Sequence, residues 1–367
     1  MKYYIIAGEA SGDLYGSRLI DEIKLIDKEA NIRFWGGDKM IQSGGVNVKH
    51  IKELAFMGFY EVLKNIFTIW KNIEFCKKDI NEFWPDRIIY IDYPGFNLVI
   101  SKWAKKSGFK NYYYISPQIW AWKESRIKTI KNSIDKLYVI FPFEQEYYKY
   151  KHKMESTYYG HPLIEQVDNF KPNIKFFKDN NISQKRDIVA FLPGSRTQEI
   201  KSMLPIFLTL KKHFSKYEFV IAGVENVDKS LYQIAKEMSV RVVYNQTYDL
   251  LTNSKAAIVT SGTASLECAL FKVPQIVCYK TSFISYFIGR TFVKIDFISL
   301  VNIILKQKVV QELIQNQLTE KELINKFNEI IDGQKRTEML GHYSKIYSML
   351  SLDKTSNNIA NSIIKSN

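Results

Sequence analysis

The segment from Ala257 to Tyr279 constrains the fold most, because it predicts a strand, a tight turn, a helix and a second strand in immediate succession. Residues 257–259 are apolar, residues 261–263 are small, and the second strand follows Pro274 after a helix rich in Ala and Leu. Such a βαβ unit directs the end of the first strand and the first amides of the helix toward one place.

This turn has the chemistry of a phosphate site. The first N–H groups of a helix have no partner within the helix and carry the positive end of its dipole, so a phosphate or diphosphate is well satisfied at Ser261-Gly262-Thr263-Ala264. Glu267 follows about one helical turn later, close enough to meet a ribose hydroxyl of the same nucleotide. An ordinary turn with Ser or Thr as N-cap explains the same residues equally well.

Strands and helices alternate along most of the chain, which predicts an α/β protein with two doubly wound domains. With 367 residues, the chain is long enough for two full cores. We expect an N-terminal domain over residues 1–168 and a second, nucleotide-binding domain over 186–340, because hydrophobic periodicity lapses over 168–185, which we take as a linker. Two such domains with ligand-facing turns imply a cleft between them. From about Leu313 the pattern is helical, and the tail over 341–367 is long enough to return to the first domain.

Composition limits the classes of partner. The 52 Lys and Arg residues exceed the 38 Asp and Glu residues by a formal charge of +14, which favours an anionic partner such as nucleic acid, a phosphorylated substrate or an anionic bilayer. The basic residues are spread out and no zinc-finger or RNP motif is present, which argues against nucleic acid.

Cysteine usage and the absence of a long apolar run indicate a cytoplasmic protein that can still touch a membrane. The three cysteines show no CxxC spacing, so neither a disulfide framework nor a metal site is expected.

The first strand, Tyr3–Ala7, leads into a glycine-containing loop and a helix that extends to about Leu25. Its glycines do not have the G-x-G-x-x-G spacing, so a dinucleotide site is weakly indicated. The candidate ligand-facing residues of this loop are Glu9, Ser11, Gly12 and Asp13. Packing is the alternative role for the glycines.

Two further strands end on candidate catalytic or binding groups. Asp92 follows a buried strand, and a carboxylate at the carboxyl end of a parallel strand faces the crevice where such folds bind ligands, so Asp92 is the candidate general base. A turn-capping role competes with this interpretation. Ser195 and Arg196 follow the strand Asp187–Leu192 at another helix start, and the Arg196 guanidinium suits diphosphate oxygens.

The segment from Leu54 to Lys78 combines many aromatic residues with interleaved lysines. An amphipathic helix packed on the core explains this pattern, and a basic, aromatic surface that meets lipid explains it too. The pattern by itself favours the core helix slightly.

Seven segments of the chain stand in the same order as the motifs of a known family: Ala7–Asp13, Met57-Gly58, Ile91-Asp92 with Pro94 and Phe96-Asn97, Ser116–Trp122, Gly160-His161, Leu192–Arg196 and Ser261–Glu267. On these segments, the chain resembles the lipid-A-disaccharide synthase family over nearly its whole length. The resemblance implies two Rossmann-like domains in the GT-B arrangement. It also implies an inverting glycosyltransferase that joins UDP-2,3-diacylglucosamine to 2,3-diacylglucosamine 1-phosphate, giving UDP and the β(1→6) disaccharide of lipid A.

The resemblance implies roles for particular residues. Asp92 would take the proton from the acceptor's 6-hydroxyl, Glu267 would bind the ribose, and Asn302 would line the donor site. Arg196 and the amides near Ser195 and over 262–264 would hold the diphosphate without a metal, and no cofactor is expected. The implied location is the cytoplasmic surface of the inner membrane of a Gram-negative bacterium, with that lipid surface as a partner, and a homo-oligomer is compatible with the sequence.

The chain departs from the family pattern at two positions. Gly95 stands where a second acidic residue is common, which leaves Asp92 as the one candidate base, and Val301 stands where a proline usually precedes Asn302. His161 suits a structural role better than an acid/base role.

Other functions compete with the transferase. Another UDP-sugar enzyme, such as a UDP-N-acetylglucosamine transferase or 2-epimerase, shares the fold but has no reason to expose a lipid-binding surface. A protein that only binds nucleotide sugars or lipid surfaces is a further alternative. Loss of Asp92 should abolish turnover in an enzyme, whereas a binding protein has no turnover. An NAD-dependent dehydrogenase is least supported, because the glycine spacing and the acidic residue after the second strand are missing.

Overall fold

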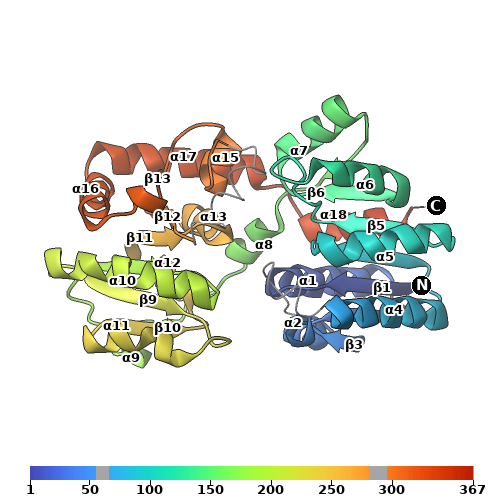
Figure 1. Ribbon diagram of the computed structural model, residues 1–367, viewed down its shortest axis with the longest axis horizontal. Helices are drawn as coiled ribbons and strands as arrows, with labels where there is room; N and C mark the ends of the chain where they lie inside the picture. Colours follow the sequence, from blue (N-terminus) through green and yellow to red (C-terminus); the bar gives the residue numbers. More distant parts are fainter. Residues whose placement is uncertain (55–65, 282–295, 367) are drawn as a thin grey trace. The chain divides into compact units, whose positions relative to one another are not determined.

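Two parallel β-sheets with helices on their faces form the framework of the protein (Figure 1). The computed structural model describes residues 1–54, 66–281 and 296–366. Residues 1–162 and 351–367 form unit 1, and residues 163–350 form unit 2. The expected fold class, an α/β protein with two doubly wound parallel sheets, is confirmed.

The sheet of unit 1 has seven parallel strands in the order β3-β2-β1-β4-β5-β6-β7. The strands are β1 (Lys2–Ala7), β2 (Asn31–Gly36), β3 (Val46–His50), β4 (Arg87–Ile91), β5 (Asn111–Tyr114), β6 (Lys136–Val139) and β7 (Thr157–Tyr158). Chain order runs outward in both directions from the β1–β4 pair, so this pair is the topological switch point of the sheet.

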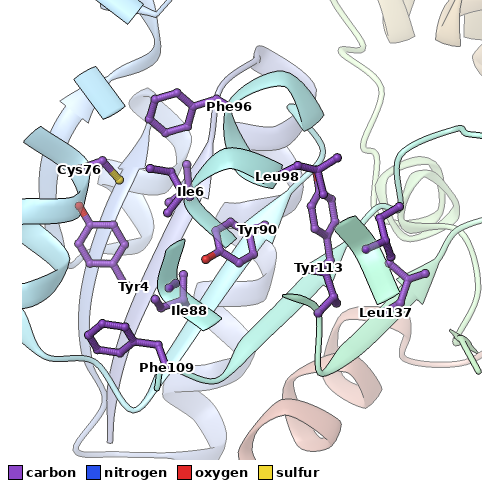
Figure 2. Close-up of a cluster of buried hydrophobic side chains, with 14 of the residues drawn as sticks. Tyr4, Ile6, Cys76, Ile88, Tyr90, Phe96, Leu98, Phe109, Tyr113 and Leu137 are labelled. Atoms are coloured by element: carbon purple, nitrogen blue, oxygen red, sulfur yellow. The ribbon is translucent and has the colours of Figure 1, made fainter. Parts of the chain in front are cut away.

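Helices cover both faces of this sheet. They are α1 (Ala10–Ile26), α2 (Asp38–Ser43), α4 (Ile66–Phe83), α5 (Pro94–Lys106), α6 (Ile127–Ser133), α7 (Pro142–Glu146) and the C-terminal α18 (Thr355–Ile364). Figure 2 shows the core on one face, where Tyr4, Ile88 and Tyr113 of the strands share a buried cluster with Cys76 of α4. On the other face α18 packs against α1, and the Tyr138 hydroxyl donates to Ser362 Oγ at 3.0 Å.

Unit 2 repeats this plan with six parallel strands in the order β10-β9-β8-β11-β12-β13. The strands are β8 (Ile188–Leu192), β9 (Glu218–Gly223), β10 (Arg241–Tyr244), β11 (Ser254–Thr260), β12 (Gln275–Tyr279) and β13 (Gln311–Ile314). Its helices include α9 (Phe176–Asp179), α10 (Thr197–His213), α12 (Thr247–Thr252), α13 (Thr263–Leu270), α15 (Leu300–Leu305), α16 (Glu320–Ile331) and α17 (Gln334–Leu350). The predicted βαβ segment is confirmed as β11, α13 and β12.

Two sequence predictions differ from the structure. The helical pattern expected from Leu313 is wrong at its start, because β13 continues to Ile314 and pairs with β12. Residues 168–185, taken as a linker, include α9 and pack into unit 2. Phe176 is fully buried there, and the Asn173 amide donates to Asp249 Oδ1 at 2.6 Å. Hydrophobic periodicity does not predict such packing, because the segment is short and mostly polar.

A buried carboxylate ties α4 to the sheet of unit 1. Asp79, 4% exposed, accepts hydrogen bonds from the Tyr4 hydroxyl at 2.7 Å and from Arg33 Nε at 2.9 Å, and it pairs with the second guanidinium nitrogen as well. Trp35 Nε1 in turn donates to the Tyr4 hydroxyl at 2.8 Å. The network therefore satisfies polar groups of β1, β2 and α4 inside an otherwise apolar cluster.

We expect Asp79→Ala to lower the free energy of unfolding of unit 1 by about 2–4 kcal/mol, because Arg33 and Tyr4 lose their shared acceptor. All six tryptophans lie in unit 1, so tryptophan fluorescence during urea unfolding follows that unit selectively. Glu74→Ala is the control, since Glu74 pairs with Lys77 on the exposed side of the same helix, and it should cost less than about 0.5 kcal/mol. Equal effects of the two substitutions would contradict a structural role for Asp79.

Candidate active site

The candidate site residues of unit 1 lie at the switch point of its sheet. Glu9 follows β1 as the N-cap of α1, and Asp92 follows β4, which pairs with β1 in parallel. Carboxyl ends of parallel strands meet at one edge, so the two acidic residues are neighbours there. Ser11, in the first turn of α1, is partly exposed at the same edge. The sequence placed Glu9, Ser11 and Asp92 in ligand-facing loops, and the topology brings them to one edge.

The backbone of Asp92 adopts a conformation that L-residues seldom use. Asp92 and Tyr93 have φ of 47° and 49°, both in the left-handed region, just before α5. The carbonyl of Asp92 accepts from Asn97 Nδ2 at 2.7 Å and from the Tyr113 hydroxyl at 2.6 Å. Tyr93 packs so close to Gly8 that a Cβ there would lie 2.4 Å from its ring. These contacts hold a strained turn in place, as is common at functional sites.

The carboxyl of Asp92 has an unusual protonation equilibrium. Burial and then the negative charge of Glu9 raise the pKa of Asp92 to about 6, against smaller opposing effects of the Tyr93 amide and the Arg126 guanidinium. A carboxylate with a pKa near neutrality is a better proton acceptor than an ordinary Asp. The geometry therefore suits the general base that the sequence predicted.

Asp13 and Gly12 have structural explanations. Asp13 is 5% exposed, and its carboxylate accepts from the amides of Gly37, Lys39 and Met40 at 2.7, 3.1 and 3.0 Å. It therefore caps α2, whose first amides otherwise lack partners. A Cβ on Gly12 would lie 3.2 Å from the Ala7 Cβ, so this glycine lets α1 approach β1 closely. These contacts give both residues a structural role, and the ligand contacts expected of them from the sequence stay predictions.

Glu144 is a site-forming residue that sequence reasoning missed. It is fully buried and accepts from the amides of Ile140 and Phe141, each at 3.0 Å, and from Trp120 Nε1 at 2.9 Å. Burial is the main cause that raises its pKa, to about 7. Glu144 thereby anchors the aromatic loop 116–122, which follows β5 beside β4. The sequence Pro142-Phe143-Glu144 at the start of a helix could have predicted this role, because an acidic residue in the first turn can accept hydrogen bonds from the amides at the helix start.

His161 is 3% exposed, and burial lowers its pKa to about 3. The ring is therefore neutral at physiological pH and cannot serve as the acid there. This agrees with the structural role that we preferred from the sequence.

In unit 2, the loop after β8 carries an exposed arginine. Arg196 is the N-cap residue of α10, and its side chain is 58% exposed. Glu199, one turn into α10, accepts from the Ser195 amide at 2.9 Å and approaches Arg196 at 3.5 Å, so it shapes the loop. Gly194 has φ of 111°, and a Cβ there would clash with Glu199. Glu199 was not among the expected residues, although its place in the first turn of a helix is a capping signal.

The N-terminus of α13 lies after β11, the parallel neighbour of β8. Gly262 is its N-cap, with φ of 155° and ψ of −162°, a conformation that only glycine adopts readily. Gly262 and Thr263 are exposed and Ala264 is partly exposed, so the first amides of α13 are accessible. Ser261 uses its hydroxyl to donate to the Ile298 carbonyl at 2.8 Å, which makes it a loop anchor. Glu267 is partly buried and accepts from the Tyr248 hydroxyl at 3.0 Å.

Asn302 has no capacity left for a ligand. It is fully buried in α15, and its Nδ2 donates to the Val310 carbonyl at 3.0 Å and to Glu312 Oε1 at 2.8 Å. Its Oδ1 accepts from the amides of Val309 and Val310 at 2.8 and 2.9 Å. All four hydrogen-bonding positions of the amide are thus used inside unit 2, which gives Asn302 a structural role, and the expected donor contact stays a prediction. Residues 294 and 295, a few positions before Asn302 in the chain, lie outside the described residues.

Within residues 1–54, 66–281 and 296–366, no group of three or more His, Cys, Asp or Glu side chains has an arrangement that could hold a metal ion.

Comparison with solved structures defines the class of protein. The UDP-GlcNAc 2-epimerase from Neisseria meningitidis, solved with UDP-GlcNAc bound, is similar with a TM-score of 0.69 at 13% identity over 100% of both chains. A glycotransferase of kitacinnamycin is similar with a TM-score of 0.65 at 11% identity, over 99% of this chain and 98% of the other. The fold is therefore the GT-B fold that glycosyltransferases share with these epimerases.

Comparison of sequences identifies the family. The family model described as Lipid-A-disaccharide synthetase matches residues 3–365. The lipid-A-disaccharide synthase of Syntrophus aciditrophicus is 37% identical, over 85% of this chain and 83% of its own length. Those of Geobacter metallireducens and Coxiella burnetii (strain Dugway 5J108-111) are 33% and 31% identical, over 91% and 97% of this chain and 88% and 96% of their own lengths. The chain belongs to the lipid-A-disaccharide synthase family, the glycosyltransferases of lipid A biosynthesis, as its sequence motifs predicted.

We expect kcat/KM to fall below a midpoint near pH 6, because the candidate base Asp92 accepts a proton only when deprotonated. Phosphate monoesters titrate near the same pH, so the decisive measurement is the shift of the midpoint in Glu9→Gln. Removing the negative charge of Glu9 should move the midpoint to lower pH. Asp21→Asn, which removes an exposed carboxylate from α1, should leave it in place. An unmoved midpoint in Glu9→Gln would exclude Asp92 as the titrating group.

Proposed function

We propose that this chain transfers 2,3-diacylglucosamine from its UDP conjugate to the 6-hydroxyl of 2,3-diacylglucosamine 1-phosphate, with inversion at the anomeric carbon. The products are the β(1→6)-linked disaccharide 1-phosphate and UDP. The observation that carries the proposal is the Asp92 carboxyl, whose pKa is raised to about 6 at the switch point of unit 1, in a chain of this family.

The chemistry assigned to Asp92 is a single displacement. Its carboxylate takes the proton of the acceptor hydroxyl while that oxygen attacks the anomeric carbon from the face opposite UDP. The bond between the anomeric carbon and the diphosphate oxygen breaks, and UDP leaves with the electron pair. One carboxylate is sufficient for this step, which fits the glycine at position 95.

The leaving diphosphate binds, in this proposal, at the carboxyl edge of the unit 2 sheet. The accessible amides at the start of α13 and the exposed Arg196 guanidinium supply hydrogen bonds and positive charge for the developing negative charge. Glu267 lies one turn into α13 and accepts a ribose hydroxyl. Ser195, Gly262, Thr263 and Ala264 contribute backbone to this cradle.

The lipid substrates suggest a membrane-facing surface, and α4 supports one. Its described part exposes Phe67, Trp70 and Phe75, with relative exposures of 77%, 61% and 45%. Lys71 and Lys78 are exposed on the same helix. Exposed aromatic residues beside lysines are typical of helices that lie on anionic bilayers. Residues 55–65 of the predicted segment lie outside the described residues, and no described helix is long and apolar enough to cross a bilayer.

The transferase reaction is tested by UDP release from purified protein in detergent with both lipid substrates. We expect release to depend on the acceptor, and Asp92→Ala and Asp92→Asn to lower kcat by about 10²- to 10⁴-fold, because a general base contributes that much. Calorimetry should show nearly unchanged UDP binding by both variants. Asp21→Asn serves as the control and should keep full turnover. Bound UDP without acceptor-dependent release would overturn the proposal and favour a UDP-sugar epimerase or a binding protein.

Membrane association is tested by sedimentation with vesicles of phosphatidylglycerol and phosphatidylethanolamine. We expect the double variant Phe67→Ser and Trp70→Ser to lower partitioning at least about tenfold, since burying each side chain contributes roughly 1.5–3 kcal/mol. Ile174→Ser removes an apolar side chain that is 97% exposed in unit 2, and it should have little effect. Equal binding of the double variant and the unmodified protein would remove α4 as the membrane-facing element.

A further inference from the structure

Arg126 is a partly buried arginine of unit 1 whose guanidinium has no carboxylate partner among the described residues. Arg126 lies at the end of a short 3-10 turn, Glu124–Arg126, which follows the aromatic loop 116–122 and precedes α6. Its guanidinium lies 5.0 Å from the centroid of the Trp122 ring, and Lys123 Nζ lies 4.5 Å from the same ring. Among the described residues, the guanidinium has neither a hydrogen bond nor an ion pair.

The other arginines that are at least partly buried in the described chain are all engaged. Arg33 binds Asp79, Arg87 donates to backbone carbonyls near the C-terminus, and Arg336 donates to the Lys255 carbonyl at 2.6 Å. Arg18 also has a partner. Burial lowers the pKa of Arg126, which shows that its charged form is incompletely solvated. A partly buried guanidinium with five N–H donors that are unused among the described residues is well suited to bind an anionic ligand.

Arg126 lies near the candidate base without touching it. The charges of Arg126 and Asp92 affect each other's protonation, and both affect Tyr113, whose hydroxyl donates to the Asp92 carbonyl. No ion pair within 4.0 Å joins Arg126 to Asp92 in the structure. An acceptor that presents its hydroxyl to Asp92 therefore lies within the electrostatic reach of Arg126.

We propose that Arg126 binds the phosphate of the acceptor sugar and so selects acceptors that carry an anionic group. The inference rests on the proposed transferase function. The acceptor phosphate fits better than the donor diphosphate, because Arg126 belongs to the unit that holds the base, and the donor diphosphate has its own cradle at α13. A guanidinium fork matches the oxygens of a phosphate monoester, and the Trp122 ring restricts its orientation.

The test compares kcat/KM for 2,3-diacylglucosamine 1-phosphate and for 2,3-diacylglucosamine without the phosphate. We expect Arg126→Gln to lower the preference for the phosphorylated acceptor about 10- to 100-fold, the range for a lost hydrogen bond to a charged group. Arg126→Lys, which keeps the charge but not the fork, should recover part of the preference. Lys123→Gln is the matched control, because Lys123 contacts the same ring but is exposed, and it should keep the preference.

A second measurement applies even if the acceptor without phosphate turns over too slowly to measure. In Arg126→Gln, KM for the phosphorylated acceptor should rise while KM for the UDP-sugar stays within about twofold. A rise in the donor KM instead, or equal losses on both acceptors with a higher pH midpoint, would overturn the inference, since Arg126 would then act on the donor or through Asp92. If the proposed transferase function itself is wrong, the unmodified protein will show no acceptor-dependent UDP release. That result is distinct from any effect of Arg126→Gln.

Discussion

The parallel order of the strands is the constraint on which the candidate site depends. Parallel strands need crossover helices, so every carboxyl end falls on one edge of its sheet, and the order reverses at one pair of strands. In unit 1 that pair places Glu9 beside Asp92, and in unit 2 it places the loop 193–196 beside the start of α13. Residues more than 60 positions apart in the chain are thereby brought to a common edge without any direct bond between them.

Burial then decides what these residues can do. Desolvation and the negative charge of Glu9 raise the pKa of Asp92 to about 6, while the positive charge of Arg126 lowers it by a smaller amount. Glu144 lies nearby with a raised pKa of about 7, and its three hydrogen bonds hold the aromatic loop. Partial desolvation raises the pKa values of these carboxyls and leaves the charge of Arg126 incompletely solvated, which suits the transfer of a proton and the binding of an anion.

The structure also separates binding candidates from structural residues of the same type. Asp13 and Asn302 were expected at binding sites like Asp92 and Glu267, but their side chains bond to the folded chain itself: three amides donate to the Asp13 carboxylate, and all four hydrogen-bonding positions of the Asn302 amide are used. A saturated polar group stabilises the loop around it and has nothing left for a ligand. Glu199 and Glu144 have the same function for the loops that carry Arg196 and Trp120.

The sequence by itself determined the alternation of strands and helices, the two parallel sheets, the family and the polar residues at the strand ends, because periodicity and turn residues are local properties. It did not reveal β13 or the packing of residues 168–185, whose short elements have no clear period. Only the tertiary structure decided that the Asp13 carboxylate and the Asn302 amide bond to their own chain, that Arg126 has no hydrogen bond or ion pair among the described residues, and that the pKa of Asp92 is raised. Those properties depend on distant neighbours and on exclusion of water, which no local pattern in the chain records.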